Sequence, residues 1–275
     1  MRFLSDLGNR RRALCVPAFI TFLVISLAGA VLTAGAAERR FPFRPGERLT
    51  FEAKWSFVPV GEAVLEVMPP TSVKGVKARH FLMTVKTNKF ADVFYKVRDR
   101  FDSYADMDMT RSIFYKKLQQ GKTKRDAAAH FDWKKGEVYY KNFDFKRSPI
   151  KLLAGSFDPL SVFYFFRLHD LAQNKEIKTP VTDGKKCVMG KAKVIRREKI
   201  KLKSGTYDSY LVEPELKHIG GVFEKSKNAK LQIWVTADDL RIPLRVKSKV
   251  VVGHFVAELI RSEKTGMDTT HGSGR

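Results

Sequence analysis

Two carboxylates two residues apart form the sharpest catalytic pattern in the chain. Asp106-Met107-Asp108-Met109-Thr110 matches the Asp-x-Asp-x-Thr arrangement of some phosphoryl-transfer enzymes, where the first carboxylate is the nucleophile and the second an acid/base. That chemistry needs the motif at the end of a buried parallel strand. Here it follows Phe101-Asp102-Ser103-Tyr104, with no alternation of strands and helices around it. We therefore expect a turn between antiparallel strands.

Other catalytic and metal-binding patterns are missing from the sequence. The histidines are scattered, without the spacing of a helical metal site or a neighbouring set of cysteine ligands: His80, His130, His169, His218, His254 and His271. There is no Gly-x-Ser-x-Gly elbow or phosphate-cradling glycine loop. We expect no metal, no cofactor and no catalysis, although a hydrolase site assembled from separate strands remains an alternative.

The densest charge signal runs from Lys185 to Lys203, where Glu198 is the one acidic residue. Alternate residues of a strand share a face, so Lys191 and Lys193 would project together with Lys199 and Lys201. Such a strip could bind phosphates of lipid or lipopolysaccharide, or an acidic glycan. The alternative is a solvated sheet face whose charges discourage edge pairing. The candidate ligand-binding cations are Lys191, Lys193, Arg196 and Arg197.

Aromatic residues supply the candidate apolar contacts. Trp55, Phe94 and Trp133 could line a cavity, with ordinary core packing as the alternative. A second basic cluster precedes Trp133 and could in principle bind nucleic acid: Lys116, Lys117, Lys122, Lys124 and Arg125. Export of the chain argues against that partner, so we expect no nucleic acid.

The N-terminus has the pattern of an export signal. Arginines at positions 2 and 10–12 precede an apolar run from Ala13 to about Leu32, and small residues follow up to Ala37. We expect a signal peptide over residues 1–37, with an uncleaved anchor as the alternative. In both cases the remaining chain is translocated. The predicted location is periplasmic or otherwise exported.

Cleavage would leave a basic chain with one cysteine. Removing Cys15 leaves Cys187 alone, so no intramolecular disulfide can form and the fold must depend on its core. The full chain has a formal net charge of +23, and about +20 remains without the signal. A chain this basic is attracted to polyanions.

Period-two alternation of apolar and polar residues dominates the rest of the chain. It begins at Leu49 and predicts antiparallel strands near 49–57, 63–67, 81–87, 93–104, 113–119, 125–133, 137–145, 187–202, 206–213, 229–236, 242–250 and 252–261. We expect one β-rich domain over residues 38–261 and a loose tail over 262–275.

One helix is expected within this β pattern. Asp158-Pro159 suits a helix start, and the segment should continue to about Leu171. Residues 160–168 are apolar on nearly every side, which predicts a buried helix that plugs or covers the sheet. The predicted fold is mainly β: a curved antiparallel sheet or open β-barrel, lipocalin-like or LolA-like in outline. Lysines and arginines on many strands argue against an outer-membrane barrel.

Several segments resemble a family of bacterial exported proteins known as domain of unknown function 3108. The resembling segments are Phe43–Phe51, Val60–Ala63, Asp158–Ser161, Gly205–Tyr207, Val212–Pro214, Ile233–Val235 and Arg241–Val246. The resemblance implies an exported β-rich domain and carries over no catalytic or ligand residues.

These observations favour a periplasmic, non-enzymatic binding or carrier protein for an anionic lipid or glycan of the envelope. Apolar concave residues would hold an acyl chain and a basic rim its head group. The alternatives are an envelope scaffold or assembly factor that binds a partner protein or the wall, and a hydrolase. The mature domain is expected to be soluble or peripherally associated with a membrane.

Overall fold

The computed structural model describes residues 41–215, 230–250 and 253–264. The chain divides into two compact units, residues 1–39 and 40–275, and all described residues belong to the second. The signal peptide expected over residues 1–37 and the tail beyond residue 264 lie outside the described residues.

A single antiparallel sheet contains all fifteen strands that the described residues form. In chain order the elements are β1 (Glu47–Trp55), β2 (Val58–Val73), β3 (Val76–Thr87), α1 (Lys89–Tyr95), β4 (Arg98–Asp106), β5 (Ser112–Gln119), β6 (Arg125–Asp132), β7 (Glu137–Asn142), β8 (Phe145–Lys146), β9 (Ile150–Lys151), α2 (Ser161–Phe166), β10 (Glu176–Thr182), β11 (Cys187–Leu202), β12 (Gly205–Pro214), β13 (Lys230–Thr236), β14 (Pro243–Val250) and β15 (Gly253–Lys264). The predicted mainly β architecture is confirmed.

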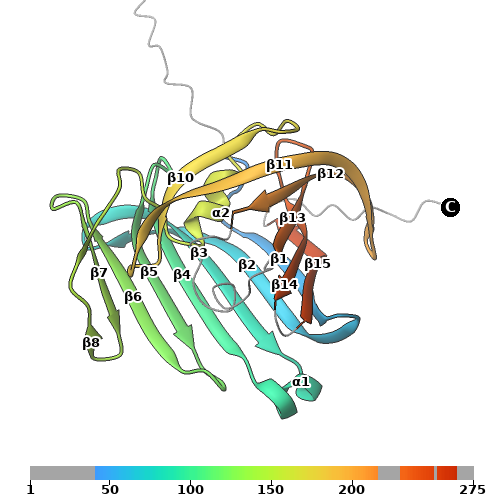
Figure 1. Ribbon diagram of the computed structural model, residues 1–275, viewed down its shortest axis with the longest axis horizontal. Helices are drawn as coiled ribbons and strands as arrows, with labels where there is room; N and C mark the ends of the chain where they lie inside the picture. The colour runs from blue at the N-terminus through green and yellow to red at the C-terminus, as the bar shows by residue number, and fades with distance from the viewer. Residues whose placement is uncertain (1–40, 216–229, 251–252, 265–275) are drawn as a thin grey trace, which may run out of the picture. The chain divides into compact units, whose positions relative to one another are not determined.

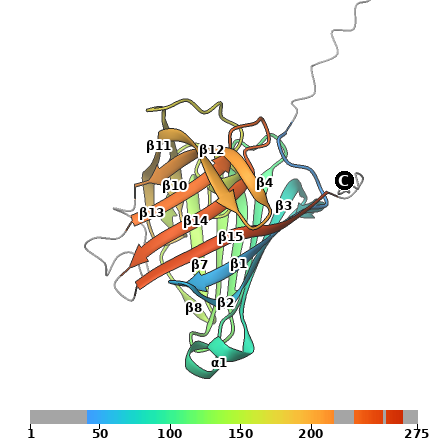
Figure 2. The same cartoon turned by 90° about the vertical axis from the view of Figure 1, so that its right-hand side faces the viewer.

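The sheet curls into an open barrel. Its path begins at β10, passes through β15 and β1, and ends at β8, with β9 paired to β7. The described strands include no ladder between β10 and β8, so the barrel does not close (Figures 1 and 2). The chain before α2 partly covers the free edge of β10, because the Phe157 N–H donates to Pro180 O and the Thr182 N–H to Phe157 O, both at 2.9 Å.

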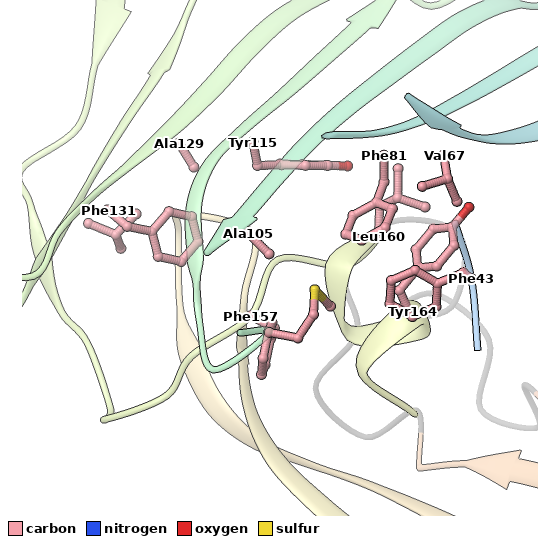
Figure 3. Close-up of a cluster of buried hydrophobic side chains, with 12 residues drawn as sticks. Phe43, Val67, Phe81, Ala105, Tyr115, Ala129, Phe131, Phe157, Leu160 and Tyr164 are labelled. Atoms are coloured by element: carbon pink, nitrogen blue, oxygen red, sulfur yellow. The ribbon is translucent and has the colours of Figure 1, made fainter. Parts of the chain in front are cut away.

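The helix α2 packs on the concave face, as expected for a plug. Figure 3 shows Leu160 and Tyr164 from this segment among strand residues such as Phe81. The Tyr164 ring stacks on Phe81, with centroids 3.9 Å apart. Asp158 caps the helix start, because its Oδ1 accepts the amide N–H of Leu160 at 2.8 Å and of Ser161 at 3.0 Å.

The expected bounds of α2 are wrong, since the helix begins at Ser161, two residues after Pro159, and ends at Phe166 instead of near Leu171. The next amides donate three residues back: Arg167 N–H to Tyr164 O, and Leu168 N–H to Phe165 O. This tighter winding is typical of a helix end. It turns the Arg167 side chain inward.

The inward Arg167 forms a buried ion pair with Glu47. Its Nη1 lies 2.6 Å from Glu47 Oε1 and its Nη2 lies 3.0 Å from Oε2, while the remaining N–H groups donate to the carbonyls of Leu240 and Pro42. The Arg167 side chain has no exposed surface and that of Glu47 is 4% exposed. The pair joins α2 to the start of β1.

A second buried polar cluster surrounds Asp158. Its Oδ2 accepts the hydroxyls of Ser103 at 2.7 Å and Ser112 at 2.6 Å, so the carboxyl joins α2 to β4 and β5. Burial raises the pKa of the Asp158 carboxyl against the opposing hydrogen bonds. Four donors compensate for its removal from water.

The helix α1 corrects the expected strand over residues 93–104. The Asn88 side chain accepts the Ala91 N–H at 2.9 Å and starts a short helix, so β4 begins only at Arg98. Other differences are β9 and β10, which were not expected, β2, which spans Val58–Val73 instead of 63–67, and β15, which continues to Lys264 instead of ending at residue 261.

The described helices are short. None of them has the length and apolar character needed to cross a membrane.

The Asp106–Thr110 motif forms a turn between β4 and β5, as predicted. Asp106 Oδ1 accepts the Thr110 N–H at 2.7 Å, and Met109 adopts a left-handed backbone conformation with φ of 54°. The Asp106 carboxylate therefore stabilises a turn, and the antiparallel strands on either side differ from the setting that the phosphoryl-transfer motif requires.

Candidate functional site

Exposed apolar side chains gather at one end of the sheet. In an antiparallel meander every second turn lies at the same end, and Figure 1 shows the β1–β2 turn, α1, the β5–β6 turn and the β7–β8 turn along its lower edge. Ten of the fourteen exposed large hydrophobic residues among those described belong to this end. We call these ten the apolar rim: Trp55, Phe57, Val58, Phe90, Val93, Phe94, Tyr95, Phe143, Phe145 and Phe255.

The helix α1 contributes the densest part of the apolar rim. Phe90 and Phe94 lie one turn apart, with ring centroids separated by 5.6 Å. Phe94 is 69% exposed and Val93 is 79% exposed, whereas Ala91 is the one described residue of α1 that is buried. The helix therefore holds most of its apolar surface in solvent, which a folding requirement does not explain.

Hydrogen bonds join Asn88, at the start of α1, to the first residues of β2, which follow the β1–β2 turn. The Asn88 N–H donates to Val60 O at 2.9 Å, and Asn88 Nδ2 donates to Pro59 O at 2.8 Å. In that turn Phe57 is 94% exposed. The neighbouring β15 adds Phe255, which lies directly opposite Trp55. Segments from distant parts of the sequence thus form one edge.

A cationic depression of about 600 Å³ lies beside α1. It is lined by Asp92, Phe94, Lys96, Arg98, Gln120, Gly121 and Lys122. Asp92 is the one acid of this lining and is already paired with Arg98, at 2.5 Å between Nη2 and Oδ2. The hydrogen bond from Arg98 lowers the pKa of the Asp92 carboxyl. Lys96 and Lys122 therefore leave the depression with a net positive charge.

A close backbone contact brings the two lysines together. The Lys122 N–H donates to Lys96 O at 3.0 Å, and the Gln120 N–H donates to Arg98 O at 2.8 Å. A Cβ at Gly121 would lie 2.2 Å from Lys96 O, so glycine is required at this crossing. Lys122 Nζ lies 5.5 Å from the Tyr95 ring centroid, which places a cation against the apolar rim.

The three candidate aromatic residues do not share a cavity. Trp55 is 52% exposed and, with Phe94, belongs to the apolar rim. Trp133 lies at the far end of β6, where its Nε1 donates to Ser112 O at 2.7 Å. Trp133 is therefore a packing residue near α2. The structure brings two of the three to the same end of the sheet.

The expected cationic strip on β11 does not form. A bulge between Val194 and Arg196 shifts the register against β12. Lys193 lies opposite Glu213 and Arg196 lies opposite Leu211, so these two cations share one face. After the bulge Lys199 takes the other face, because an extra residue reverses the alternation.

Acidic neighbours also offset the charge of β11. Arg196 lies 3.0 Å from Glu198, Lys191 lies 3.9 Å from Glu215, and Arg197 pairs with Asp208. All four candidate cations of this strand are exposed. The arrangement matches the solvated sheet face that we weighed as the alternative. Among the described residues, no group of three or more His, Cys, Asp or Glu side chains is placed to hold a metal ion.

Sequence reasoning missed the apolar rim as a unit. Trp55 and Phe94 were predicted as separate cavity-lining residues. The signal that could have predicted the rim is the occurrence of aromatic residues at every second turn of the predicted strands. Glu47 was not recognised as a buried partner of α2. Asp158 was expected at the helix start, but its burial and its bonds to β4 and β5 were not.

Comparison with known proteins gives a family and a fold. A profile of the family described as proteins of unknown function, DUF3108, matches residues 50–260. No curated protein matches the chain. The β-barrel-like protein of domain of unknown function DUF1849 from Brucella abortus is similar in structure, with a TM-score of 0.50 and 10% identity over 80% of this chain and 98% of that one.

Two further solved structures are more distant. A candidate exported protein with a YmcC-like fold from Bacteroides fragilis has a TM-score of 0.36 and 7% identity, over 82% of this chain and 98% of that one. A candidate lipoprotein from Parabacteroides distasonis has a TM-score of 0.32 and 10% identity, over 81% and 97%. The Brucella structure supports the β-barrel-like fold alone, so function must be inferred from the geometry.

Proposed function

This chain belongs to the DUF3108 family of proteins of unknown function, and from that premise we propose that it is an exported, non-enzymatic envelope protein that binds anionic lipid at a membrane surface through its apolar rim. The observation that carries the proposal is the exposed aromatic face of α1 beside the cationic depression. Export is the sequence-based part of the proposal.

The chemistry of the apolar rim suits the interface of a bilayer. Trp55 and Tyr95 have rings of the kind that favours the headgroup level, where the ring meets hydrocarbon and its polar group meets water. The phenylalanines of the rim supply purely apolar area, as on the buried face of an interfacial helix. A lysine near an anionic leaflet contributes about 1 kcal/mol of attraction. Lys96 and Lys122 lie close enough to the rim to act together with it, and the net charge of the chain attracts it to the same surface.

The position of α2 limits where lipid can bind. Its side chains fill the concave face (Figure 3), at the end remote from α1 (Figure 1). A lipocalin-like enclosure of the whole concave face is therefore not supported, and binding is proposed at the α1 end.

The test is cosedimentation of the purified protein with vesicles of phosphatidylcholine alone or mixed with phosphatidylglycerol. We expect binding to the mixed vesicles, and a loss of about tenfold or more when Phe90 and Phe94 are both changed to Ser, because exposed aromatic area and charge act together. Lys96→Glu with Lys122→Glu should reduce binding to the anionic vesicles specifically.

A further test variant is Val93→Ser, in α1, and its matched control is Val76→Ser. Val76 is also an exposed valine, at 49%, but belongs to the β2–β3 turn at the other end of the sheet. The Val93 change should weaken vesicle binding and the Val76 change should not. Equal binding by all variants would overturn the proposal, and retention of the protein by an envelope protein in place of vesicles would favour the scaffold alternative.

A further inference from the structure

Below α2, a row of inward-facing residues crosses the concave face. Leu65 and Phe101 of this row pack against the core beneath α2, which places the row on the concave side. The cross-strand partners follow one another from β2 to β7: Leu65, Met83, Phe101, Lys117, Ala127 and Asn142. Directly opposite residues share a face. The row is apolar on β2–β4 and polar on β5 and β7.

The next row toward the apolar rim is apolar on β2 and β3 and polar from β4 to β6. It consists of Ala63, Val85, Asp99, Gln119 and Arg125. We call these two rows the concave strip. The apolar part that both rows share lies on β2 and β3, whose ends carry the β1–β2 turn and α1. A hydrocarbon chain leaving a membrane at the rim would therefore meet apolar side chains first.

Lys117 is the unusual group of the concave strip. Its Nζ lies 5.2 Å from the Phe101 ring centroid. Burial lowers the pKa of Lys117, and the neighbouring Arg125 and Lys185 lower it further. Lys117 is partly buried, and a cation partly withdrawn from water beside other cations is unfavourable without an anion.

The acids near Lys117 have other partners. Asp99 accepts from Gln119 Nε2 at 2.6 Å, and Asp183 lies 3.3 Å from Lys185 Nζ. Within the described part of the chain, no ion pair of Lys117 is present, although Asp99 and Asp183 act on it at longer range. The folded protein therefore leaves this positive charge incompletely compensated.

The β10–β11 turn forms a wall beside the row. A Cβ at Gly184 would lie 2.9 Å from the Ala129 Cβ, so the turn approaches β6 closely, and Gly184 has a left-handed φ of 88°. Lys185 Nζ lies 5.5 Å from the Tyr140 ring centroid. Lys117, Arg125 and Lys185 thus come together from three separate segments.

We propose that the concave strip binds one molecule of an anionic amphiphile, with its headgroup phosphate on Lys117 and its hydrocarbon chain along Leu65, Met83 and Phe101. The inference deepens the proposed function, since the apolar rim would supply contact with the membrane from which the amphiphile comes. A free anion would satisfy the cations but would leave the apolar half of the strip uncovered.

The test uses lysophosphatidylglycerol below its micelle concentration, with binding measured by native mass spectrometry. Lys117→Met keeps the length of the side chain and removes its charge, so we expect binding to weaken by about tenfold or more, the equivalent of one lost charge-assisted hydrogen bond. Lys116→Met is the matched control. Lys116 is the adjacent residue on the opposite face of β5 and lies 3.4 Å from Asp126.

Three outcomes decide the inference. Weaker binding by Lys117→Met with unchanged binding by Lys116→Met supports it. Equal binding by both variants overturns it. Binding of inorganic phosphate alone, dependent on Lys117 and as tight as that of the lysolipid, overturns the amphiphile in favour of a free anion. Because Lys117→Met removes an unfavourably placed charge, we expect its thermal unfolding temperature to be no lower than that of the wild type.

Vesicle binding separates this inference from the proposed function. Lys117→Met should cosediment with anionic vesicles as the wild type does, whereas the Phe90/Phe94 serine variant should still bind the lysolipid in solution. Loss of vesicle binding alone, or of lysolipid binding alone, therefore identifies which of the two surfaces fails.

Discussion

The two ends of the sheet differ in how charged and apolar side chains are placed. At the α2 end, the buried charges have partners: Arg167 meets Glu47, and Asp158 accepts four hydrogen bonds. At the rim end, aromatic side chains are exposed and Lys96 lies in a depression with excess positive charge. Leaving either buried charge without its partners would destabilise the fold, whereas the exposed aromatic side chains contribute little to folding. The α2 end therefore depends on its buried polar contacts for stability, and the rim end is the one at which we propose membrane binding.

The largest expected effect follows from breaking the buried ion pair. Arg167→Met leaves the Glu47 carboxylate buried without its cation, so the free energy of unfolding should fall by about 3–5 kcal/mol. Urea denaturation followed by tryptophan fluorescence measures this. Arg261→Met is the control, because its pair with Glu263 is exposed and should contribute less than about 1 kcal/mol. Similar losses in both variants would contradict the assignment of the α2 end.

The next effect concerns the second polar cluster. Asp158→Ala removes the acceptor of two serine hydroxyls and two amide N–H groups, and should lower the free energy of unfolding by about 2–4 kcal/mol. Asp106→Ala, in the exposed β4–β5 turn, should cost about 1 kcal/mol by the same denaturation assay. An Asp158 variant as stable as the Asp106 variant would show that the cluster does not hold α2.

A loss of stability at acid pH is expected from Asp102, in the middle of β4. Burial acts to raise the pKa of Asp102, but hydrogen bonds from His80 and Arg100 outweigh it and lower the pKa from 3.8 to about 2. A carboxyl with a lowered pKa stabilises the fold above its unfolded value and loses that stabilisation as the pH falls from about 4 to about 2. The loss should be about 2 kcal/mol.

Denaturation at a series of pH values measures this loss. Asp102→Asn should be less stable than the wild type at neutral pH and should show a flatter dependence over the same acid range. An unchanged slope in that variant would assign the acid sensitivity to other carboxyls.

The smallest effect on stability is expected at the apolar rim. Phe94→Ser should change the free energy of unfolding by less than about 0.5 kcal/mol, because the side chain is mostly exposed. Phe157→Ala, in the core near α2, should cost about 3–5 kcal/mol. Thermal and urea unfolding of both variants measure this difference between the two ends. A large fall in the free energy of unfolding of Phe94→Ser would show that the apolar rim is needed for folding.

Local patterns in the sequence predict most strands because they depend on neighbouring residues. Alternation at Leu49 and Phe51 predicts β1, and Asp158 is identified as a cap. The helix α1 was missed because Phe90, Val93 and Tyr95 are good strand formers, and the cap at Asn88 decides their conformation. A strong β-forming composition thus concealed a short capped helix.

Contacts between distant residues could not be predicted. Glu47 and Arg167 are 120 residues apart, and a charged residue in a sequence carries no sign of whether it will be buried. The bulge at Val194 also leaves no clear sequence signal, although it reverses the face on which Lys199 lies. A one-residue shift of register exchanges the two faces of a strand.

The sequence by itself determined the β-rich character, the turn at Asp106, the cap at Asp158 and the excess of positive charge. Each follows from backbone geometry over a few residues or from composition. The folded sheet was needed to show that aromatic side chains from alternate turns form one apolar rim, and that Lys117 faces the concave side beside Lys185. Register and sheet curvature determine these neighbours, and both arise from packing over the whole sheet.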